Sequence, residues 1–577
     1  MTSDTTTPTR SKNTVAPDDT LDPITFAVIK NALDSIIDEV AYTIVRTARS
    51  EIVKDVMDYS AAFCAADGQM VAQAKTIALH LGAVPEAMRV ITKKYLGKLA
   101  PGDAVILNDP YQGGMHLPDI FMVMPVFHSG QLQGFFVVIC HHTDMGGRVP
   151  GSNASDSTEI YQEGLRIPAV KLYEQGEMNE MLRDIIAKNV RVPDLVLGDL
   201  KAQYTAGQVG ARELSGLFDK NGPELMQRCF TELLDYAERM TRQEIAGWPD
   251  GTYRFTDYID NDGFNDQPLP IAVAITVQGD GLIVNYEGSS GQVAAALNST
   301  LSYTQSCTYL SVRSVLKADI PNNQGLFRAI KVIAPEASIL NPQMPAPCAA
   351  RALTGYRVFD AMLGALAQIV PDQVPAAGEG GNTVVSIGGY RQDRTPFIIV
   401  DMICGAWGAR PDQDGIEAIT NPSQNLSNTP VETMEARQPI RIEEYGLLPD
   451  SCGAGRWRGG LGITRSYRLL ADSAVLQLRA DRTRFKPYGL AGGQPSVFCS
   501  NKLFRDGQWQ DLPGKVTCTI QKNDVVRHEQ AGGGGFGPPS ERSAALIERD
   551  VFNQKISPEH AKTKYGYEVA GNGEKPA

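Results

Sequence analysis

The chain has 577 residues, enough for roughly three or four domains of ordinary size. With 42% apolar and 21% charged residues, its composition is that of a globular protein and excludes a fibrous or wholly disordered chain. The formal net charge is −12 and there is no run of Lys and Arg, which argues against a nucleic-acid partner because binding to phosphates requires clustered positive charge.

The N-terminal segment and the cysteines indicate the compartment. Residues 1–20 are polar and lack the apolar segment of a secretion signal, so they are predicted to form a disordered tail. No apolar stretch approaches the ~20 residues of a membrane-spanning helix. The nine cysteines are scattered and never spaced as CxxC, which favours reduced thiols. We therefore expect a cytoplasmic protein with no membrane partner.

The first elements are a helix and a hairpin. Asp22 followed by Pro23 is typical of a helix start, and apolar residues at helical spacing, beginning with Ile24 and Val28, predict one amphipathic helix to about residue 50. The stretch MDYSAAFCAADGQMVAQ (57–73) places two short apolar runs around Ala-Asp-Gly, which predicts a β-hairpin.

Further elements follow in chain order. A second helix is predicted to begin at Pro85, and DAVIL (103–107) and GFFVVIC (134–140) have the continuous apolar character of buried strands. Residues 172–245 are mainly helical in pattern. The alternating pattern of residues 252–288 predicts antiparallel strands, and helices are expected near 300–318 and 353–369.

The C-terminal third is rich in glycine and strand-like. Its segment AGGGGFG (531–537) has the GxGxxG spacing, but two prolines follow where a nucleotide-binding helix would begin. We therefore predict a mobile surface loop there, whose glycines would also allow close backbone approach to a ligand or partner.

Histidines and aspartates gather near the ends of the predicted strands. His116 and Asp119 are three residues apart in GGMHLPDIF, a spacing at which a turn can aim both side chains at one ion. His141 and His142 directly follow a predicted strand, where successive side chains point to opposite faces, so only one is expected to join His116. Alternation alone does not decide between His141 and the pair formed by His142 and Asp144.

Other residues and motifs carry weaker signals. Asp58 in MDYS and His80 in ALHLG are further candidates for the same site, whereas Asp109 in NDPYQGG fits an Asx turn and Cys140 fits a buried, inert thiol. The sequence contains no GxxxxGK[ST] phosphate loop, no HExxH and no GxSxG motif. A metal site of imidazole and carboxylate at the strand ends is therefore the predicted chemistry.

These patterns predict a mixed α+β, multidomain fold. We expect a disordered tail (1–20), an N-terminal metal-binding α/β domain (21–245), a mixed β/α middle domain (246–380) and a β-rich C-terminal domain with Gly-rich loops (381–577).

A series of segments in fixed order resembles a known family. The segments are DYSAAFCAADGQMVAQ, HLGAVPEAM, LNDPYQGGMHLPDI, HHTDMGG, ADIPNNQGLFRAI, PDSCGAGRWRGGLG and GGGGFGPP. Together they resemble the hydantoinase B family, which comprises the B subunits of ATP-dependent N-methylhydantoinases, 5-oxoprolinases and caprolactamase and is related to acetone and acetophenone carboxylase subunits. The resemblance covers residues 22 to about 570.

The resemblance also implies the site residues. The family's metal ligands fall on Asp58, His116, Asp119 and His141, and the remaining acid/base candidates are His142, Asp144 and His80. Two imidazoles and two carboxylates suit zinc, which is favoured for hydrolysis, and also manganese.

By the same resemblance, the chain would be the metal-containing beta subunit of an ATP-dependent hydrolase that opens a cyclic amide such as a lactam, hydantoin or oxoproline. A hydantoinase A type partner would bind ATP and phosphorylate the carbonyl oxygen within a hetero-oligomer such as α2β2, which accounts for the missing phosphate loop. The alternatives are a subunit of an ATP-dependent ketone carboxylase, with the metal holding bicarbonate or CO2, and a non-catalytic scaffold subunit.

Overall fold

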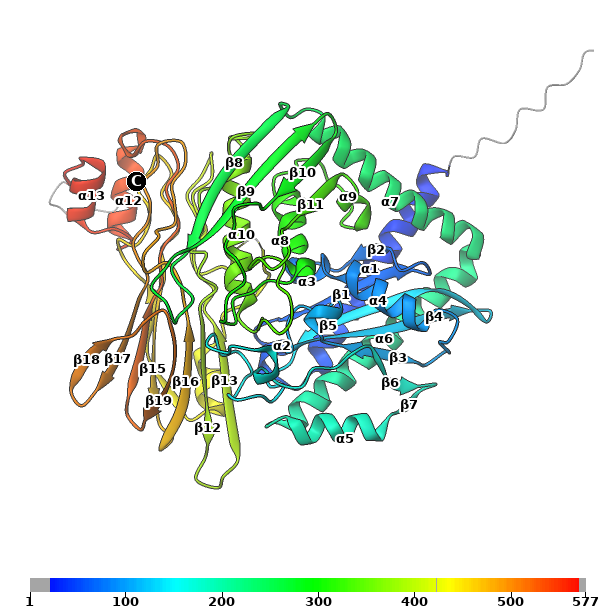
Figure 1. The fold of residues 1–577 in the computed structure, drawn as a ribbon. Coiled ribbons are helices and arrows are strands. Elements are labelled where there is room, and N and C mark those ends of the chain that lie inside the picture. Colours follow the sequence, from blue (N-terminus) through cyan, green and yellow to red (C-terminus); the bar gives the residue numbers. More distant parts are fainter. Residues whose placement is uncertain (1–20, 422, 570–577) are drawn as a thin grey trace, which may run out of the picture.

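The computed structural model describes residues 21–421 and 423–569, so the tail predicted for residues 1–20 lies outside the described residues. Helices are combined with four β-sheets, which confirms the mixed α+β, multidomain class (Figure 1). Each sheet falls inside one of the predicted domain ranges. The domain boundaries themselves remain a prediction.

The N-terminal part is built on an antiparallel seven-stranded sheet with the order β2-β1-β5-β4-β3-β6-β7. Its strands are β1 (Tyr59–Ala65), β2 (Met70–Gln73), β3 (Ala104–Leu107), β4 (Asp119–His128), β5 (Gln131–His141), β6 (Val170–Glu174) and β7 (Glu177–Met178). The predicted hairpin at 57–73 and the strands at 103–107 and 134–140 are confirmed. β4 was not predicted, although it fills the space between the two histidine segments.

Helices cover this sheet. They are α1 (Pro23–Thr47), α2 (Glu51–Lys54), α3 (Ala78–Leu81), α4 (Val84–Tyr95), α5 (Glu180–Asn189), α6 (Pro193–Asn221) and α7 (Pro223–Ile245). α1 contacts β1, and α6 packs on β4 and β5 (Figure 1). Asp22 caps α1, as predicted, by accepting a hydrogen bond from the Thr25 N–H at 2.9 Å.

The predicted apolar stripe of α1 is partly wrong. Ile24 is 75% exposed and Val28 is 61% exposed, whereas Ile29, Leu33 and Ile37 are buried. Because successive helix residues are rotated by about 100°, Ile24 and Val28 lie outside the stripe formed by the buried residues. Apolar residues in the first turns of this helix therefore do not identify the face that packs against the sheet.

The middle part has a four-stranded sheet with the order β11-β10-β9-β8. Its elements are β8 (Gly251–Ile259), β9 (Leu269–Gln278), β10 (Gly281–Asn285), α8 (Leu301–Arg313), α9 (Gln324–Phe327), β11 (Ile330–Ile333) and α10 (Arg351–Leu366). Every residue of α10 is buried, and it packs against β8 and α8. One continuous hydrophobic cluster joins this part to the N-terminal sheet.

The C-terminal part is a sandwich of two sheets with the orders β13-β12-β16-β19 and β14-β15-β20-β17-β18. Its elements are β12 (Val384–Tyr390), β13 (Pro396–Met402), α11 (Val431–Arg437), β14 (Ile440–Leu447), β15 (Ile463–Leu469), β16 (Ser473–Arg479), β17 (Ser500–Arg505), β18 (Gln508–Asp511), β19 (Lys515–Gln521), β20 (Val525–Glu529), α12 (Ala544–Phe552) and α13 (Pro558–Tyr565). Apolar residues of both sheets, such as Ile387 and Tyr467, share one core.

The segment 531–537 is buried, so the prediction of a surface loop there is wrong. The Gly533 N–H donates to the Gly460 carbonyl at 2.9 Å, and the Gly534 N–H donates to the Ala377 carbonyl at 2.8 Å. A Cβ added at Gly533 would collide with the carbonyl oxygen of Trp407. The glycines therefore serve close packing of backbone on backbone.

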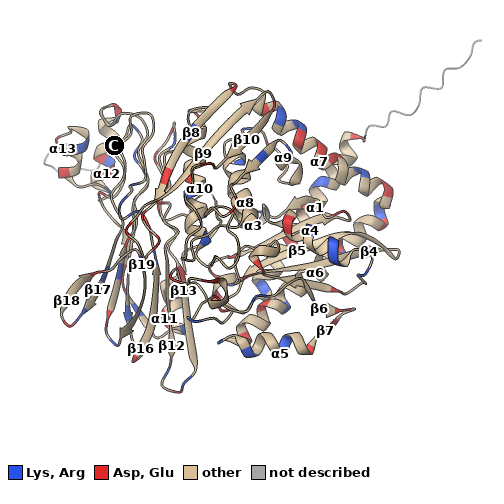
Figure 2. Cartoon of the chain, viewed as in Figure 1, with Lys and Arg blue, Asp and Glu red and all other residues tan. Residues whose placement is uncertain are grey.

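Surface charge is mixed in sign. Figure 2 shows Lys or Arg interspersed with Asp or Glu along α5 and α7. Within the described residues, no helix has both the length and the apolar character required to cross a membrane. All nine cysteines are free thiols, and eight of them are buried.

Candidate metal centre

Five ionisable side chains meet at one end of β1, β4 and β5. Asp119 is the first residue of β4 and His141 the last of β5, and the two lie opposite each other in the antiparallel ladder. Asp58 immediately precedes β1, and its carbonyl accepts from the His141 N–H at 3.1 Å. The preceding residue, Met57, has φ 67°, a left-handed conformation that is costly for a non-glycine residue and is often found at functional sites.

The remaining two side chains come from turns beside the sheet. His116 lies in the tight turn that enters β4, and His80 lies in α3. In the same turn, a Cβ at Gly114 would lie 2.5 Å from the Asn108 carbonyl oxygen, so a glycine is required for the chain to pass there.

Three of the side chains converge on one point. His116 Nε2 lies 2.9 Å from Asp119 Oδ1 and 3.2 Å from His141 Nδ1, and His141 Nδ1 lies 3.0 Å from Asp119 Oδ1. Asp58 Oδ2 is 3.8 Å from His141 Nδ1. His80 Nε2 is 3.5 Å from Asp58 Oδ1 and 3.9 Å from Asp119 Oδ2. The fold thus forms a potential metal-binding triad of His116, Asp119 and His141, with Asp58 and His80 against it.

Hydrogen bonds behind the cluster orient two of the histidines. His116 Nδ1 donates to the Ala349 carbonyl at 3.1 Å, so its neutral Nε2 carries a lone pair. The Ser60 hydroxyl donates to the Ile77 carbonyl at 3.0 Å and therefore accepts from His80 Nδ1 at 3.1 Å. Both Nε2 lone pairs then face carboxylate oxygens. Such converging lone pairs need a shared proton or a cation, so the donor set fits a divalent metal ion.

The protonation states suit metal binding. Burial, followed by the positive charge of Arg351, lowers the pKa of His116 to about 3. Burial raises the pKa of the Asp119 carboxyl, but His116 and Arg351 outweigh it and hold that pKa well below its usual value. At neutral pH His116 is therefore neutral and Asp119 ionised, the forms that coordinate metals.

His142 and Asp144 lie apart from the cluster. His142 Nε2 donates to Gln203 Oε1 at 3.0 Å, and Asp144 forms an ion pair with Arg191 at 2.9 Å. Of the two adjacent histidines, His141 is the one whose ring lies with His116 and Asp119. The acid/base roles of His142 and Asp144 remain predictions.

Two neighbouring residues have the structural roles expected from the sequence. Asp109 Oδ1 accepts from the Tyr111 N–H at 3.0 Å, which confirms the Asx turn. Burial raises the pKa of the Cys140 thiol well above its usual value, so Cys140 is an inert, protonated thiol.

Sequence reasoning missed two buried arginines beside the cluster. Arg351, at the start of α10, forms an ion pair with Asp119 Oδ2 and lies 4.5 Å from the centre of the Tyr303 ring. Arg479, at the end of β16, donates to the Ala349 carbonyl at 3.2 Å. Arg351 is separated from Asp119 by 232 residues, and no motif surrounds either arginine, so only the folded chain reveals them.

Glu163 supports the loop that orients His116. A carboxyl oxygen of Glu163 accepts from the Cys348 N–H at 2.9 Å and from the Ala349 N–H at 2.8 Å. The Ala349 carbonyl in turn accepts from His116, so Glu163 acts on the cluster through this loop.

Glu163 is expected to make stability pH-dependent. Burial raises its pKa to about 8, against an ordinary value of 4.5. The folded chain therefore keeps a proton that the unfolded chain loses between these values, and the contribution of Glu163 to stability falls as pH rises through that window, by up to ~1.4 kcal/mol per unit. Urea unfolding of the parent and of Glu163→Gln at several pH values should show a smaller fall with pH in the variant. Equal pH dependence would contradict this account.

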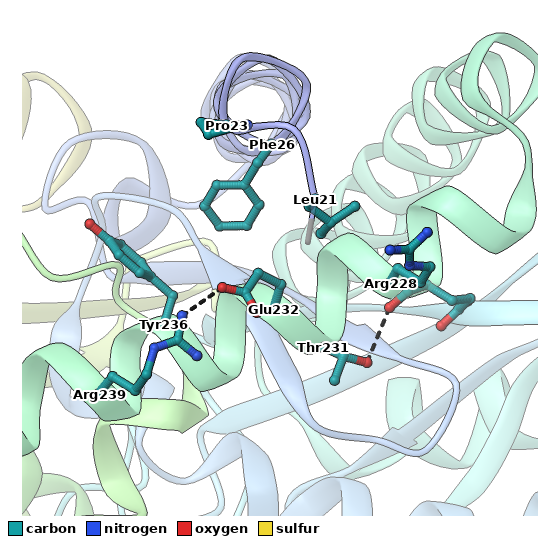
Figure 3. Close-up of a pocket in the computed structure, with 9 residues that line it drawn as sticks. Leu21, Pro23, Phe26, Arg228, Thr231, Glu232, Tyr236 and Arg239 are labelled. Carbon is teal, nitrogen blue, oxygen red and sulfur yellow. Dashed lines mark hydrogen bonds and ion pairs between the residues drawn. The ribbon is translucent and has the colours of Figure 1, made fainter. Parts of the chain in front are cut away.

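The molecule also has a surface pocket of about 710 Å³ between the start of α1 and α7. Figure 3 shows Leu21 and Phe26 facing α7, where Glu232 is paired with Arg239 at 2.6 Å. No histidine and none of the metal-cluster residues lines this pocket. The buried cluster therefore remains the better candidate for chemistry.

The chain matches the family model "Hydantoinase B/oxoprolinase" over residues 22–539, and it belongs to this family. It is 33% identical over 574 residues to the B subunit of a putative D-/L-hydantoinase from a Pseudomonas species (strain NS671), with 96% of each chain covered.

Two solved structures share its fold. The ATP-dependent caprolactamase from Pseudomonas jessenii superimposes with a TM-score of 0.91 at 32% identity, covering 96% of this chain and 98% of that chain. A nucleotide-free acetone carboxylase gives a TM-score of 0.90 at 17% identity, covering 95% of this chain and 80% of that chain, a level that shows the fold alone.

Proposed function

We propose that this chain is the metal-containing beta subunit of an ATP-dependent cyclic amide hydrolase. The observation that carries the proposal is the buried cluster of His116, Asp119 and His141, in a chain similar to a hydantoinase subunit and to an ATP-dependent caprolactamase. The substrate class is a lactam, hydantoin or oxoproline, whose carbonyl oxygen has been phosphorylated before this chain acts.

Asp58, His116, Asp119 and His141 are the proposed metal ligands, with zinc favoured and manganese the alternative. The ion would supply a Lewis acid that acidifies water and polarises a carbonyl or phosphoryl oxygen. Arg351 keeps Asp119 ionised, and the Ala349 carbonyl fixes the tautomer of His116. These contacts hold the donor atoms ready without reorganisation.

His80 is the proton acceptor that the geometry favours. Burial lowers its pKa, so it is neutral at pH 7, and Ser60 fixes its Nδ1 as the protonated nitrogen. Its Nε2 is free to take a proton from water next to Asp58 and Asp119. His142 and Asp144, proposed from the family resemblance as further acid/base groups, would have to act from the positions beside Gln203 and Arg191.

Phosphorylation makes an otherwise poor electrophile reactive, because it converts the amide into an O-phosphorylated imidate, whose C=N carbon has lost the amide resonance and accepts water. Water adds to that carbon, and the ring C–N bond breaks as nitrogen takes a proton, which leaves an acyl phosphate. A second water then forms the carboxylate as the C–O bond to orthophosphate breaks. Because the sequence has no phosphate loop, we assign ATP binding to a partner subunit of the hydantoinase A type. The two subunits would form a hetero-oligomer, for example α2β2, and the complex would work in the cytoplasm.

The experiment is to co-express the chain with its ATPase partner and to measure ATP hydrolysis and ring opening on lactams, hydantoins and 5-oxoproline, with and without bicarbonate. Ring opening without bicarbonate is expected. Turnover of ketones only with bicarbonate would instead assign the chain to the carboxylase branch, whose fold it shares.

A further inference from the structure

Arg479 is a buried cation whose partners in the described part of the chain are all neutral. It is 5% exposed, and its guanidinium donates to neutral oxygens: Asn382 Oδ1 at 3.0 Å, Ala349 O at 3.2 Å and Asn153 Oδ1 at 3.5 Å. Among the residues that the structure describes, no carboxylate oxygen forms an ion pair with it, and its Nε has no hydrogen-bond partner. Burying a guanidinium without a paired negative charge costs free energy, and a bound anion would offset that cost.

Arg357 and Arg465, two other deeply buried arginines, also have an unbonded Nε, but each has an acidic partner. Arg357 pairs with Asp481 at 2.7 Å, and Arg465 pairs with Asp401 at 3.1 Å. The missing partner is therefore a local feature of Arg479.

Arg479 borders the metal cluster. The Ala349 carbonyl that accepts from Arg479 also accepts from His116 Nδ1. Arg351, whose charge acts on Arg479, is bound to Asp119, and no described residue accepts a hydrogen bond from its Nε. Two guanidinium groups with unused donors thus flank the same set of proposed ligands.

The charges at this point do not balance once a cation is bound. As carboxylate ligands of a bound divalent ion, Asp58 and Asp119 would match the charges of Arg351 and Arg479, and the ion itself would add two positive charges in excess. Glu163 is the further acid that faces the loop, and with a pKa of about 8 it is mostly protonated at neutral pH. A dianionic ligand would restore neutrality.

We propose that Arg479 and Arg351 form an oxyanion subsite beside the metal ligands, which binds the phosphoryl group of the activated amide and the orthophosphate finally released. The proposal rests on the proposed function, since an uncharged lactam offers no anion until its oxygen is phosphorylated. Guanidinium groups suit this ligand because their planar N–H donors match phosphoryl oxygens.

The test is a calorimetric titration of orthophosphate into the metal-loaded, full-length chain, compared with Arg479→Gln and with the exposed control Arg441→Gln. We expect phosphate binding that weakens about tenfold or more in Arg479→Gln and is unchanged in the control. Arg479→Lys keeps the positive charge but loses the planar guanidinium, so its phosphate affinity should lie between those of the parent and Arg479→Gln. If Arg479→Gln does not fold, Arg479→Lys serves as the test. An affinity equal to that of the parent would then reject the subsite.

Equal phosphate affinity in parent and Arg479→Gln, or no binding to the parent, would mean an adventitious ion only and would overturn the subsite. Tighter binding of bicarbonate than of phosphate would overturn the phosphoryl assignment. The titration needs neither partner nor turnover. Ring opening without phosphate binding would therefore remove the subsite alone, whereas phosphate binding without ring opening would support the subsite and count against the hydrolase.

Discussion

Replacement of His116 by alanine should remove the bound metal and ring opening together. His116 Nε2 lies within 3.2 Å of both other members of the triad, so the substitution removes a proposed ligand from the centre of the cluster. Metal content is expected to fall from about one ion per chain to near zero, and turnover by more than the roughly 100-fold that loss of an outer hydrogen bond costs. Elemental analysis and the ring-opening assay on the purified complex measure both.

His128→Ala is the matched control. His128 lies at the opposite end of β4 from Asp119, where its Nδ1 is 3.7 Å from Asp219 Oδ1 at the surface. This variant should keep its metal and its activity. If His116→Ala still assembled with its partner and opened the ring, the chain would be a scaffold subunit and the cluster would have no catalytic role.

Local sequence predicted where the site lies but not all of its members. Strand ends were visible as apolar runs followed by His and Asp, because a buried strand must be continuous and apolar. Alternation could not choose between His141 and His142, since the face that a side chain occupies depends on the strand opposite. That strand is β4, whose first residue, Asp119, pairs directly with His141.

Contacts between distant segments were beyond single-sequence reasoning. Arg351 is positioned at the site by α10 and Arg479 by β16, and the sequence around each arginine contains no motif that predicts this. The location of the segment 531–537 also depends on distant parts of the chain. Glycine-rich sequence is typical of an exposed loop, yet it is equally suited to a place where several backbones pack together, and only the partner segments distinguish the two.

Arg357 joins the middle and C-terminal parts of the chain through buried charges. It is fully buried in α10, and its guanidinium lies 3.2 Å from Asp257 Oδ2 in β8 and 2.7 Å from Asp481 Oδ2 just after β16. Burial raises the pKa of the adjacent Asp360 well above its usual value, although Arg357 opposes this. Together with Arg482 and Lys515, the Arg357 guanidinium permits several carboxylates to be buried close to one another.

Arg357→Met should destabilise the chain by about 3–5 kcal/mol, because the apolar side chain fills the space but leaves Asp257 and Asp481 without this partner. Urea unfolding followed by tryptophan fluorescence measures the loss. Arg441→Met, at an exposed pair with Glu443, should cost less than about 1 kcal/mol. A loss for Arg357→Met as small as that of the control would mean that Arg482 and Lys515, which also contact these aspartates, hold the two parts together without it.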